Sequence, residues 1–117
     1  MASEGEIDEA VKTARSAGCT QLVLLHCISS YPAPIDQANI KQIRNIAKRF
    51  DVISGLSDHT LGTTVSVAAV AQGASLIEKH FTLSRKDKGP DSEFSLEPAD
   101  LKKLCIDTKD AWLALGK

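Results

Sequence analysis

Three apolar segments of strand length, each placed between helical patterns, constrain the fold of this chain more than any other feature. They are QLVLLHCIS (residues 21–29), VISGLS (52–57) and SLIEKHFTL (75–83). The first is a continuous apolar run, which is the pattern of a strand covered on both faces. Strands of this kind belong to parallel sheets.

Helical patterns lie on both sides of each predicted strand. Ser3 and Glu6 form a capping box at the start of a first amphipathic stretch. Residues 40–50 and the small-residue segment 62–73 predict two more helices, and Pro98 opens a fourth. The order αβαβαβα predicts an α/β protein with parallel strands, either an open layer or a piece of a (β/α)₈ barrel.

The predicted sheet is too small to close on itself. Three parallel strands leave two long apolar edges without a partner, and a closed barrel needs eight strands and typically about 250 residues. This chain has 117 residues. We therefore expect residues 1–117 to form a single partial domain, with three strands and four helices of a partial TIM barrel, as part of something larger.

The composition argues against several functional classes. Hydrophobic residues make up 43% of the chain and charged residues 25%, which is ordinary for a globular domain. Fourteen basic residues balance fifteen acidic ones without forming blocks, so neither nucleic acid nor an anionic membrane is an expected partner. No apolar stretch approaches the ~20 residues that span a bilayer, and the acidic start is unlike a signal peptide, which predicts a cytoplasmic protein.

The three cysteines match no familiar framework. Cys19, Cys27 and Cys105 are an odd number at wide spacings, unlike a disulfide scaffold or a CxxC metal site. We expect them to be small buried apolar residues.

Two histidines end successive predicted strands. His59 and His80 both lie at the carboxyl end of a parallel strand, where binding groups collect in α/β proteins. Because side chains alternate along a strand, Ser57 shares the face of His59, and Glu78 shares the face of His80. Adjacent strands lie about 4.8 Å apart, so two imidazoles can share one divalent ion. Such an open site suits Lewis-acid catalysis; the alternative is that each histidine is a hydrogen-bonded core or rim residue.

Carboxylates beside the histidines offer acid–base chemistry. Glu78 shares a face with His80, and Asp58 directly precedes His59, so both are catalytic candidates that could orient the imidazoles or transfer protons. Asp58 could equally cap a turn. Lys79 would suit a Schiff-base aldolase only if it faced inward, but alternation turns it toward the helices, where its stem would snorkel.

Two loops could cover this face. The prolines of YPAP restrain the backbone and could hold Tyr31 over the site, although a packing role is the alternative. The segment KGPDSEFS is stiffened by glycine and proline and places Asp91 within reach of substrate hydroxyls, unless it is a plain surface turn. His26 ends the first strand, and alternation does not fix which of its faces is inward.

Five segments together resemble the catalytic barrel of the sialic acid synthase family, whose members condense phosphoenolpyruvate with an amino-sugar aldehyde. They are HCISSYPAP, GLSDHTLG, AAVAQGAS, IEKHFT and GPDSEFSLEP. The resemblance covers about residues 1–105 and implies that the three strands are the last three of the barrel. It implies that the N-terminal strands and a C-terminal antifreeze-like domain are absent, and that the parent enzyme is a domain-swapped homodimer.

The resemblance also assigns roles to individual residues. It implies that His59 and His80 bind a divalent metal, with Mn²⁺ expected and Mg²⁺ or Co²⁺ as alternatives. The implied substrate contacts are Ser57 for phosphoenolpyruvate, Tyr31 near the same ligand, Ser29 in place of a family asparagine, Glu78 beside the metal and the sugar, and Asp91 at the sugar hydroxyls.

The loops GPDSEFSLEP and YPAPIDQAN are most similar to pseudaminic acid synthases, although those enzymes commonly have lysine at the position of His26, where the sialic type has histidine. Spore-coat polysaccharide synthases are a further possibility. The expected reaction joins phosphoenolpyruvate to an N-acetylated amino sugar, of the 2,4-diacetamido-2,4,6-trideoxyhexose or N-acetylmannosamine type, giving a nonulosonic acid and phosphate.

Phosphate recognition needs converging cationic groups, and the predicted strand ends carry no basic cluster. We therefore expect the isolated chain to be inactive. The alternative is a non-catalytic module that completes a barrel by oligomerisation or with another polypeptide.

Overall fold

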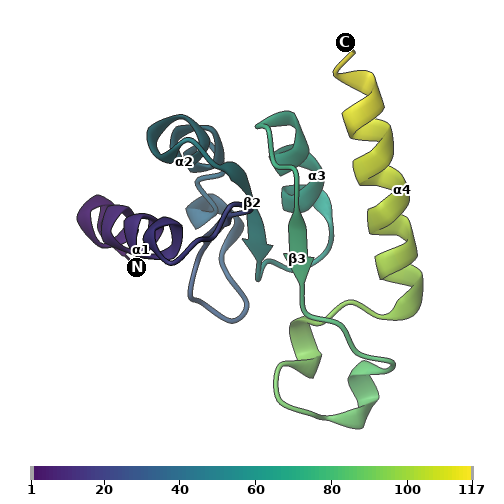
Figure 1. Cartoon of the computed structure of the whole chain (residues 1–117). Helices are drawn as coiled ribbons and strands as arrows, with labels where there is room; N and C mark the ends of the chain where they lie inside the picture. Colours follow the sequence, from purple (N-terminus) through teal and green to yellow (C-terminus); the bar gives the residue numbers. More distant parts are fainter. Residues whose placement is uncertain (1, 117) are drawn as a thin grey trace.

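A computed structural model describes residues 2–116, and helices and strands alternate along it (Figure 1). The principal elements are α1 (Glu4–Ser16), β1 (Val23–Cys27), α2 (Gln42–Phe50), β2 (Ile53–Asp58), α3 (Thr64–Ala71), β3 (Ile77–Lys79) and α4 (Pro98–Ala114). Short 3₁₀ helices are η1 (Ile35–Gln37), η2 (Arg85–Asp87) and η3 (Ser92–Phe94). Among the described residues, no helix is long and apolar enough to cross a membrane.

The strands form one parallel sheet in the order β1-β2-β3. Its register places Cys27 opposite Ser57, and Ser57 opposite Glu78, so one row of residues crosses all three strands. The predicted α/β class, with three parallel strands alternating with four helices, is confirmed.

The last strand is shorter than the apolar segment that predicted it. β3 ends at Lys79 because the chain then pairs with a distant segment: the carbonyl of His80 accepts a 2.8 Å hydrogen bond from the N–H of Leu96. Phe81 forms an isolated parallel bridge with the same residue. The loop after β3 is therefore drawn back to the end of the sheet.

Local signals explain the ends of the first and last helices. The Ser3 hydroxyl accepts from the N–H of Glu6, whose carboxylate accepts in return from the N–H of Ser3, so the predicted capping box is confirmed. At α4, Pro98 occupies the first turn, where its missing N–H costs nothing. The N–H of Glu97 donates to the carboxylate of Asp100 at 3.2 Å at that end of the helix.

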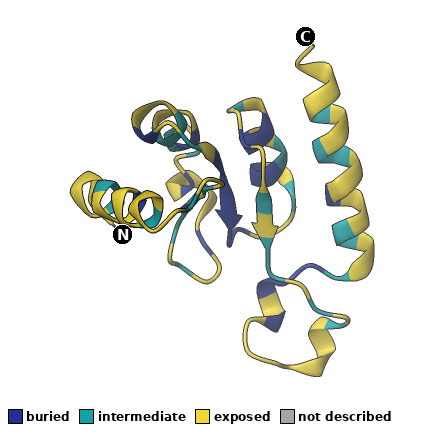
Figure 2. Ribbon diagram, viewed as in Figure 1, coloured by how far each residue is buried: buried dark blue, intermediate teal, exposed yellow. Residues whose placement is uncertain are grey.

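The core lies on one side of the sheet. The helix α2 packs on β1 and β2, while α3 packs on β2 and on α4. The buried core cluster comprises Ala38, Ile43, Leu56, Val65, Ala69 and Ala74. We call this side of the sheet the helical face. The central strand β2 is buried along most of its length (Figure 2).

We call the opposite side of the sheet the open face. It carries Val23 of β1 and Ile53 of β2 near the start of the strands, and Ser57 of β2 and Glu78 of β3 near their ends. Within residues 2–116, no helix covers Ile53, which is 57% exposed, or Val23, which is 37% exposed. Parallel sheets are normally covered on both faces, so an open face with apolar side chains fits a sheet that forms part of a larger barrel.

The expectation of buried cysteines is wrong for Cys105, which is exposed, and only partly met by Cys19 and Cys27, which are half-buried. Cys105 lies on α4, where Leu104 is the buried residue. All three thiols are free.

Candidate metal centre and active site

The two histidines predicted to form a pair lie side by side. His59 follows β2 directly and His80 follows β3, at the end of the sheet to which the strands point (Figure 1). Their ring centroids are 5.1 Å apart, with the ring planes at 66°. His59 is 6% exposed, whereas the side chain of His80 is 35% exposed. The pair is therefore open to solvent on the His80 side.

A hydrogen bond fixes the tautomer of His59. Its Nδ1 lies 2.9 Å from the carbonyl oxygen of Ile28, which can only accept, so Nδ1 carries the proton. The Nε2 atom is then left with a free lone pair, as in histidines that ligate metals. The Sγ atom of Cys27 lies 3.8 Å from the same Nδ1.

Aromatic rings surround the pair. The ring centroid of Tyr31 lies 4.2 Å from that of His59, which agrees with the expectation that the YPAP loop holds Tyr31 over the site. The loop is tied to the site by the N–H of Ala33, which donates to the carbonyl of His59 at 2.8 Å. Phe94, in η3, lies 5.1 Å from the ring of His80. These rings shield His59 and leave one side of His80 accessible.

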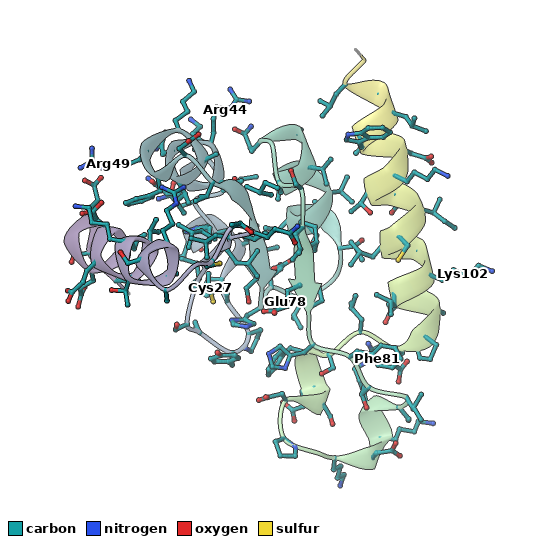
Figure 3. The ribbon with its side chains drawn as sticks, in the orientation of Figure 1. Cys27, Arg44, Arg49, Glu78, Phe81 and Lys102 are labelled. Carbon is teal, nitrogen blue, oxygen red and sulfur yellow. The ribbon has the colours of Figure 1, made fainter. Side chains whose placement is uncertain are left out.

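Ser57 and Glu78 join β2 to β3 below the histidines. The Ser57 hydroxyl donates a 2.7 Å hydrogen bond to Oε1 of Glu78. Cys27 and Glu78, the two ends of this row, are labelled in Figure 3 on the outer strands. Glu78 is exposed on the open face, so its second oxygen remains available to a ligand.

Asp91 approaches the site from the loop after β3. Its Oδ2 lies 3.5 Å from Nδ1 of His80, and both side chains are partly exposed. Asp91 adopts a left-handed backbone conformation with φ of 64°, and its carbonyl accepts from the Ser95 hydroxyl at 2.7 Å. The loop thus brings a carboxylate to the exposed side of the histidine pair.

The structure does not bring Asp58 to the histidines. Its carboxylate points to the helical face, where it accepts hydrogen bonds from Thr60, Ser66 and Lys79. Of the two roles expected for Asp58, catalysis and the capping of a turn, this geometry supports the second. Lys79 also faces the helices, as alternation predicts, but its ammonium is buried and does not reach solvent.

Ser29 and His26 border a cavity beside β1. Ser29 is exposed and lines a cavity of about 600 Å³ that is bounded by α1, β1 and α2. His26 also lines it and is 8% exposed, with Nε2 2.9 Å from the carbonyl oxygen of Ala38. His26 therefore belongs to the helical face, which the sequence left undecided.

The donor set fits an open metal site. Among residues 2–116, no group of three or more His, Cys, Asp or Glu side chains is arranged to hold an ion. Two imidazoles remain, one with a fixed free Nε2; imidazole nitrogens suit Zn²⁺ and related transition-metal ions, whereas Mn²⁺ also favours oxygen ligands such as carboxylates and water. Other ligands would have to come from water, substrate or protein outside these residues.

An exposed charge cluster holds the loop after β3 against α4. Arg85 donates to Asp100 at 2.9 Å and to the carbonyl of Ser95 at 3.1 Å. The hydrogen bond from Arg85, followed by that from the N–H of Glu97, lowers the pKa of Asp100. The same bond raises the pKa of Arg85. These contacts anchor the loop that carries Asp91 and Phe94.

No sequence pattern predicts that Phe94 and Cys27 lie beside the histidines. Phe94 is the one aromatic residue of a polar loop, and Cys27 shares its strand face with Ser29, so weak signals for both existed. Neither signal indicates contact with a histidine.

The likeness of the chain to a solved structure defines its class of protein. The chain superposes on the crystal structure of an N-acetylneuraminic acid (sialic acid) synthetase from Leptospira borgpetersenii serovar Hardjo-bovis, in complex with citrate, with a TM-score of 0.95 and 38% identity. The match covers 100% of this chain and 41% of that one. The fold is thus an α/β segment that matches part of a TIM-barrel synthase.

The family follows from the sequence comparison. The model of the NeuB family matches residues 1–117, and the chain belongs to this family. It is 44% identical to the N,N'-diacetyllegionaminic acid synthase of Campylobacter jejuni, over 99% of this chain and 35% of that protein. It is 37% identical to the pseudaminic acid synthase of Helicobacter pylori, over 100% of this chain and 34% of that protein.

The chain spans about a third of the length of these curated relatives. Their names differ in the acid that is made, and the identities do not single out the pseudaminic type. The resemblance to the synthase family is confirmed at the family level, while the subfamily stays a prediction.

Proposed function

We propose that this chain forms the metal-binding part of a phosphoenolpyruvate-dependent nonulosonic acid synthase. The observation that carries the proposal is the convergence of His59 and His80, with ring centroids 5.1 Å apart at the ends of adjacent parallel strands. Membership of the NeuB family supports it. A divalent ion held there, with Mn²⁺ the expected choice, would supply Lewis-acid polarisation of the aldehyde oxygen of the sugar.

The polar and aromatic residues around the histidine pair have proposed parts in this reaction. His59 and His80 would hold the ion, and Tyr31 would exclude water from one side of His59. Ser57 orients the carboxylate of Glu78, whose free oxygen contacts the sugar and can hold a proton. Asp91, at the exposed side of His80, accepts hydrogen bonds from sugar hydroxyls. Asp58 is left out of the catalytic set because its oxygens are already occupied on the helical face.

The reaction itself joins two bound substrates. The electron pair of the C2=C3 double bond of phosphoenolpyruvate forms a bond from carbon 3 to the aldehyde carbon, the aldehyde C=O π bond breaks, and its oxygen takes a proton to become a hydroxyl. Water then adds at the electron-poor carbon 2 and loses a proton, and the C2–O bond to phosphate breaks as the second water proton leaves, which gives a keto group and phosphate. Close placement of the two substrates accounts for much of the expected acceleration.

The phosphate requires groups that the described residues beside the histidine pair do not offer. The neighbours of the histidine pair are aromatic rings, hydroxyls and carboxylates, whereas phosphate binding uses lysine, arginine or helix N-termini. We propose that these groups come from the rest of a larger synthase, which pairs with the edges of this sheet and assembles as a homodimer. The chain alone should then be inactive.

A chimera tests the proposal. The 118-residue match in the Campylobacter jejuni N,N'-diacetyllegionaminic acid synthase is replaced by this chain. The chimera is then incubated with Mn²⁺, phosphoenolpyruvate and a panel of N-acetylated sugars, including 2,4-diacetamido-2,4,6-trideoxyhexoses and N-acetylmannosamine. Metal-dependent phosphate release with one sugar is expected, and the preferred sugar tests the pseudaminic prediction.

A matched pair of variants controls for indirect effects. His59→Ala should abolish release, whereas His26→Ala removes an imidazole of similar burial from the helical face and should leave metal dependence intact. A folded chimera without activity would contradict the proposal. Release by the 117-residue chain alone at roughly 1 s⁻¹, an ordinary enzymatic rate, would contradict the need for further groups.

A further inference from the structure

A buried ion pair lies directly behind the two histidines, on the helical face. Nζ of Lys79 is 3.2 Å from Oδ2 of Asp58, and the two side chains are 3% and 1% exposed. Asp58 immediately precedes His59, and Lys79 immediately precedes His80, so alternation sends the charged residues to one face and the imidazoles to the other. The two charged side chains lie on the opposite side of the sheet from Ser57 and Glu78.

Every donor of the lysine is used. Besides Asp58, Nζ donates to the carbonyl of Thr60 at 2.7 Å and to the carbonyl of Gly62 at 2.8 Å. An ammonium has three donors, so its capacity is filled. Lys79 therefore contacts the chain on both sides of His59, through the side chain before it and a backbone carbonyl after it.

The aspartate is equally committed. Oδ1 of Asp58 accepts from the N–H and the hydroxyl of Thr60, at 2.9 Å and 2.7 Å. Oδ2 accepts from the hydroxyl of Ser66 in α3, at 2.5 Å. The network thus connects the end of β3 with the end of β2, the following loop and the first turns of α3.

The sheet itself does not hold the histidines against each other. The last residue pair in register between β2 and β3 is Asp58 with Lys79. One residue further, the carbonyl of His59 accepts from Ala33 and that of His80 accepts from Leu96, which belong to two different loops. On the open face, the rings of Tyr31 and Phe94 each pack on both imidazoles. On the helical face, the ion-pair network joins the two segments that carry the histidines.

We propose that Lys79 and Asp58 are positioning residues, which set the separation of His59 and His80 so that both imidazoles reach one divalent ion. The proposal rests on the proposed function of the histidine pair. A buried ion pair is often replaceable by apolar residues without loss of stability, so its main effect here is on geometry. Groups that orient metal ligands in this way commonly change metal affinity by about 10- to 100-fold.

The test uses the whole chain and two readouts. Zn²⁺ is the probe, because nitrogen sites bind it more tightly than Mn²⁺, and its Kd is measured by calorimetry. The nuclear Overhauser effect (NOE) between the ring protons of His59 and His80 reports their separation without metal. The principal variant combines Asp58→Asn with Lys79→Met, which removes both charges and leaves no unpaired one.

The expected result is a folded double variant with a Zn²⁺ Kd raised about 10- to 100-fold and a weakened NOE between the two histidines. The NOE between Tyr31 and His59 should persist, because it depends on the loop after β1. Lys12→Met is the matched control: it breaks an exposed ion pair with Asp8, at 2.6 Å, and should change neither readout. If the double variant does not fold, the isosteric Asp58→Asn alone should move both readouts in the same direction.

Two failures are distinguishable. Equal Zn²⁺ binding by wild type and His59→Ala would overturn the proposed metal pair, and the NOE would still decide the positioning role. Loss of Zn²⁺ binding in His59→Ala, together with wild-type affinity and NOE in the folded double variant, would overturn the positioning role alone.

Discussion

Replacing Gly55 by alanine should separate β2 from β3. Gly55 lies in β2, and an added Cβ would lie 2.8 Å from Cδ2 of Leu25, 3.0 Å from the carbonyl carbon of Leu76, and closer still to the Leu76 oxygen. That oxygen accepts a 2.9 Å hydrogen bond from the N–H of Leu56. A leucine side chain can move, but a carbonyl held between two strands cannot move without breaking this bond.

The magnitude follows from the two losses. Overpacking at a buried position costs about 1–3 kcal/mol, and the loss of the bond between Leu56 and Leu76 costs about 0.5–1.5 kcal/mol. Alanine restricts the unfolded chain and returns about 0.4–1 kcal/mol. The free energy of unfolding should therefore fall by roughly 1–4 kcal/mol. Separation of the strands would also lengthen the bond between Ser57 and Glu78 in the site.

Urea unfolding followed by circular dichroism measures this change. Gly5→Ala in α1 is the control, because an added Cβ at Gly5 meets nothing within 4 Å. Alanine is favoured over glycine in helices by up to about 1 kcal/mol, so the control should leave stability unchanged or raise it. The same chemical change is thus expected to act with opposite sign at the two glycines. A Gly55→Ala protein as stable as wild type would refute the argument from the Leu76 carbonyl.

Two further perturbations test the surroundings of the site. Tyr31→Ala should speed the modification of His59 by diethyl pyrocarbonate, because the Tyr31 ring that covers His59 lies only 4.2 Å from it. Tyr31→Phe keeps the ring and should leave the rate of modification unchanged. Equal rates in the two variants would contradict the stacking. Acid should loosen the loop after β3, because Arg85 lowers the pKa of Asp100. The ionised carboxylate contributes its full stabilisation above the unfolded-state pKa of about 3.9. This stabilisation is lost as the pH falls through the lower pKa of the folded state. Asp100→Asn should remove that part of the acid transition by circular dichroism, and an unchanged transition would speak against it.

The strands and the histidine pair were predictable because their signals are local. Alternation from Ser57 to His59 and from Glu78 to His80 needs only the strand boundaries, and the boundaries follow from apolar runs that end in polar residues. The capping box at Ser3 is equally local. The predictions that the structure bears out thus depend on residues a few positions apart.

The remaining parts of the site depend on contacts between distant residues. Phe94 reaches His80 because Leu96 pairs with the carbonyl of His80, and no spacing in a polar loop predicts that pairing. Alternation turned Lys79 toward the helices, but the expectation of a snorkelling stem was wrong. The path of the loop after β2, which brings the carbonyls of Thr60 and Gly62 to the ammonium, is set by tertiary structure.

The ion pair between Asp58 and Lys79 also fixes the register of β3 against β2, because each charged residue directly precedes a histidine. Each of the dipeptides Asp58-His59 and Lys79-His80 sends one charged residue to the helical face and one imidazole to the open face. A slip of β3 by one residue would reverse its faces, placing Lys79 on the open face and His80 against the helices. Asp58 would then be buried without its partner, which costs about 3–5 kcal/mol for a broken buried pair. The arrangement that aligns the imidazoles is therefore also the arrangement that leaves no charge unpaired, so β3 is held in the register that the site requires.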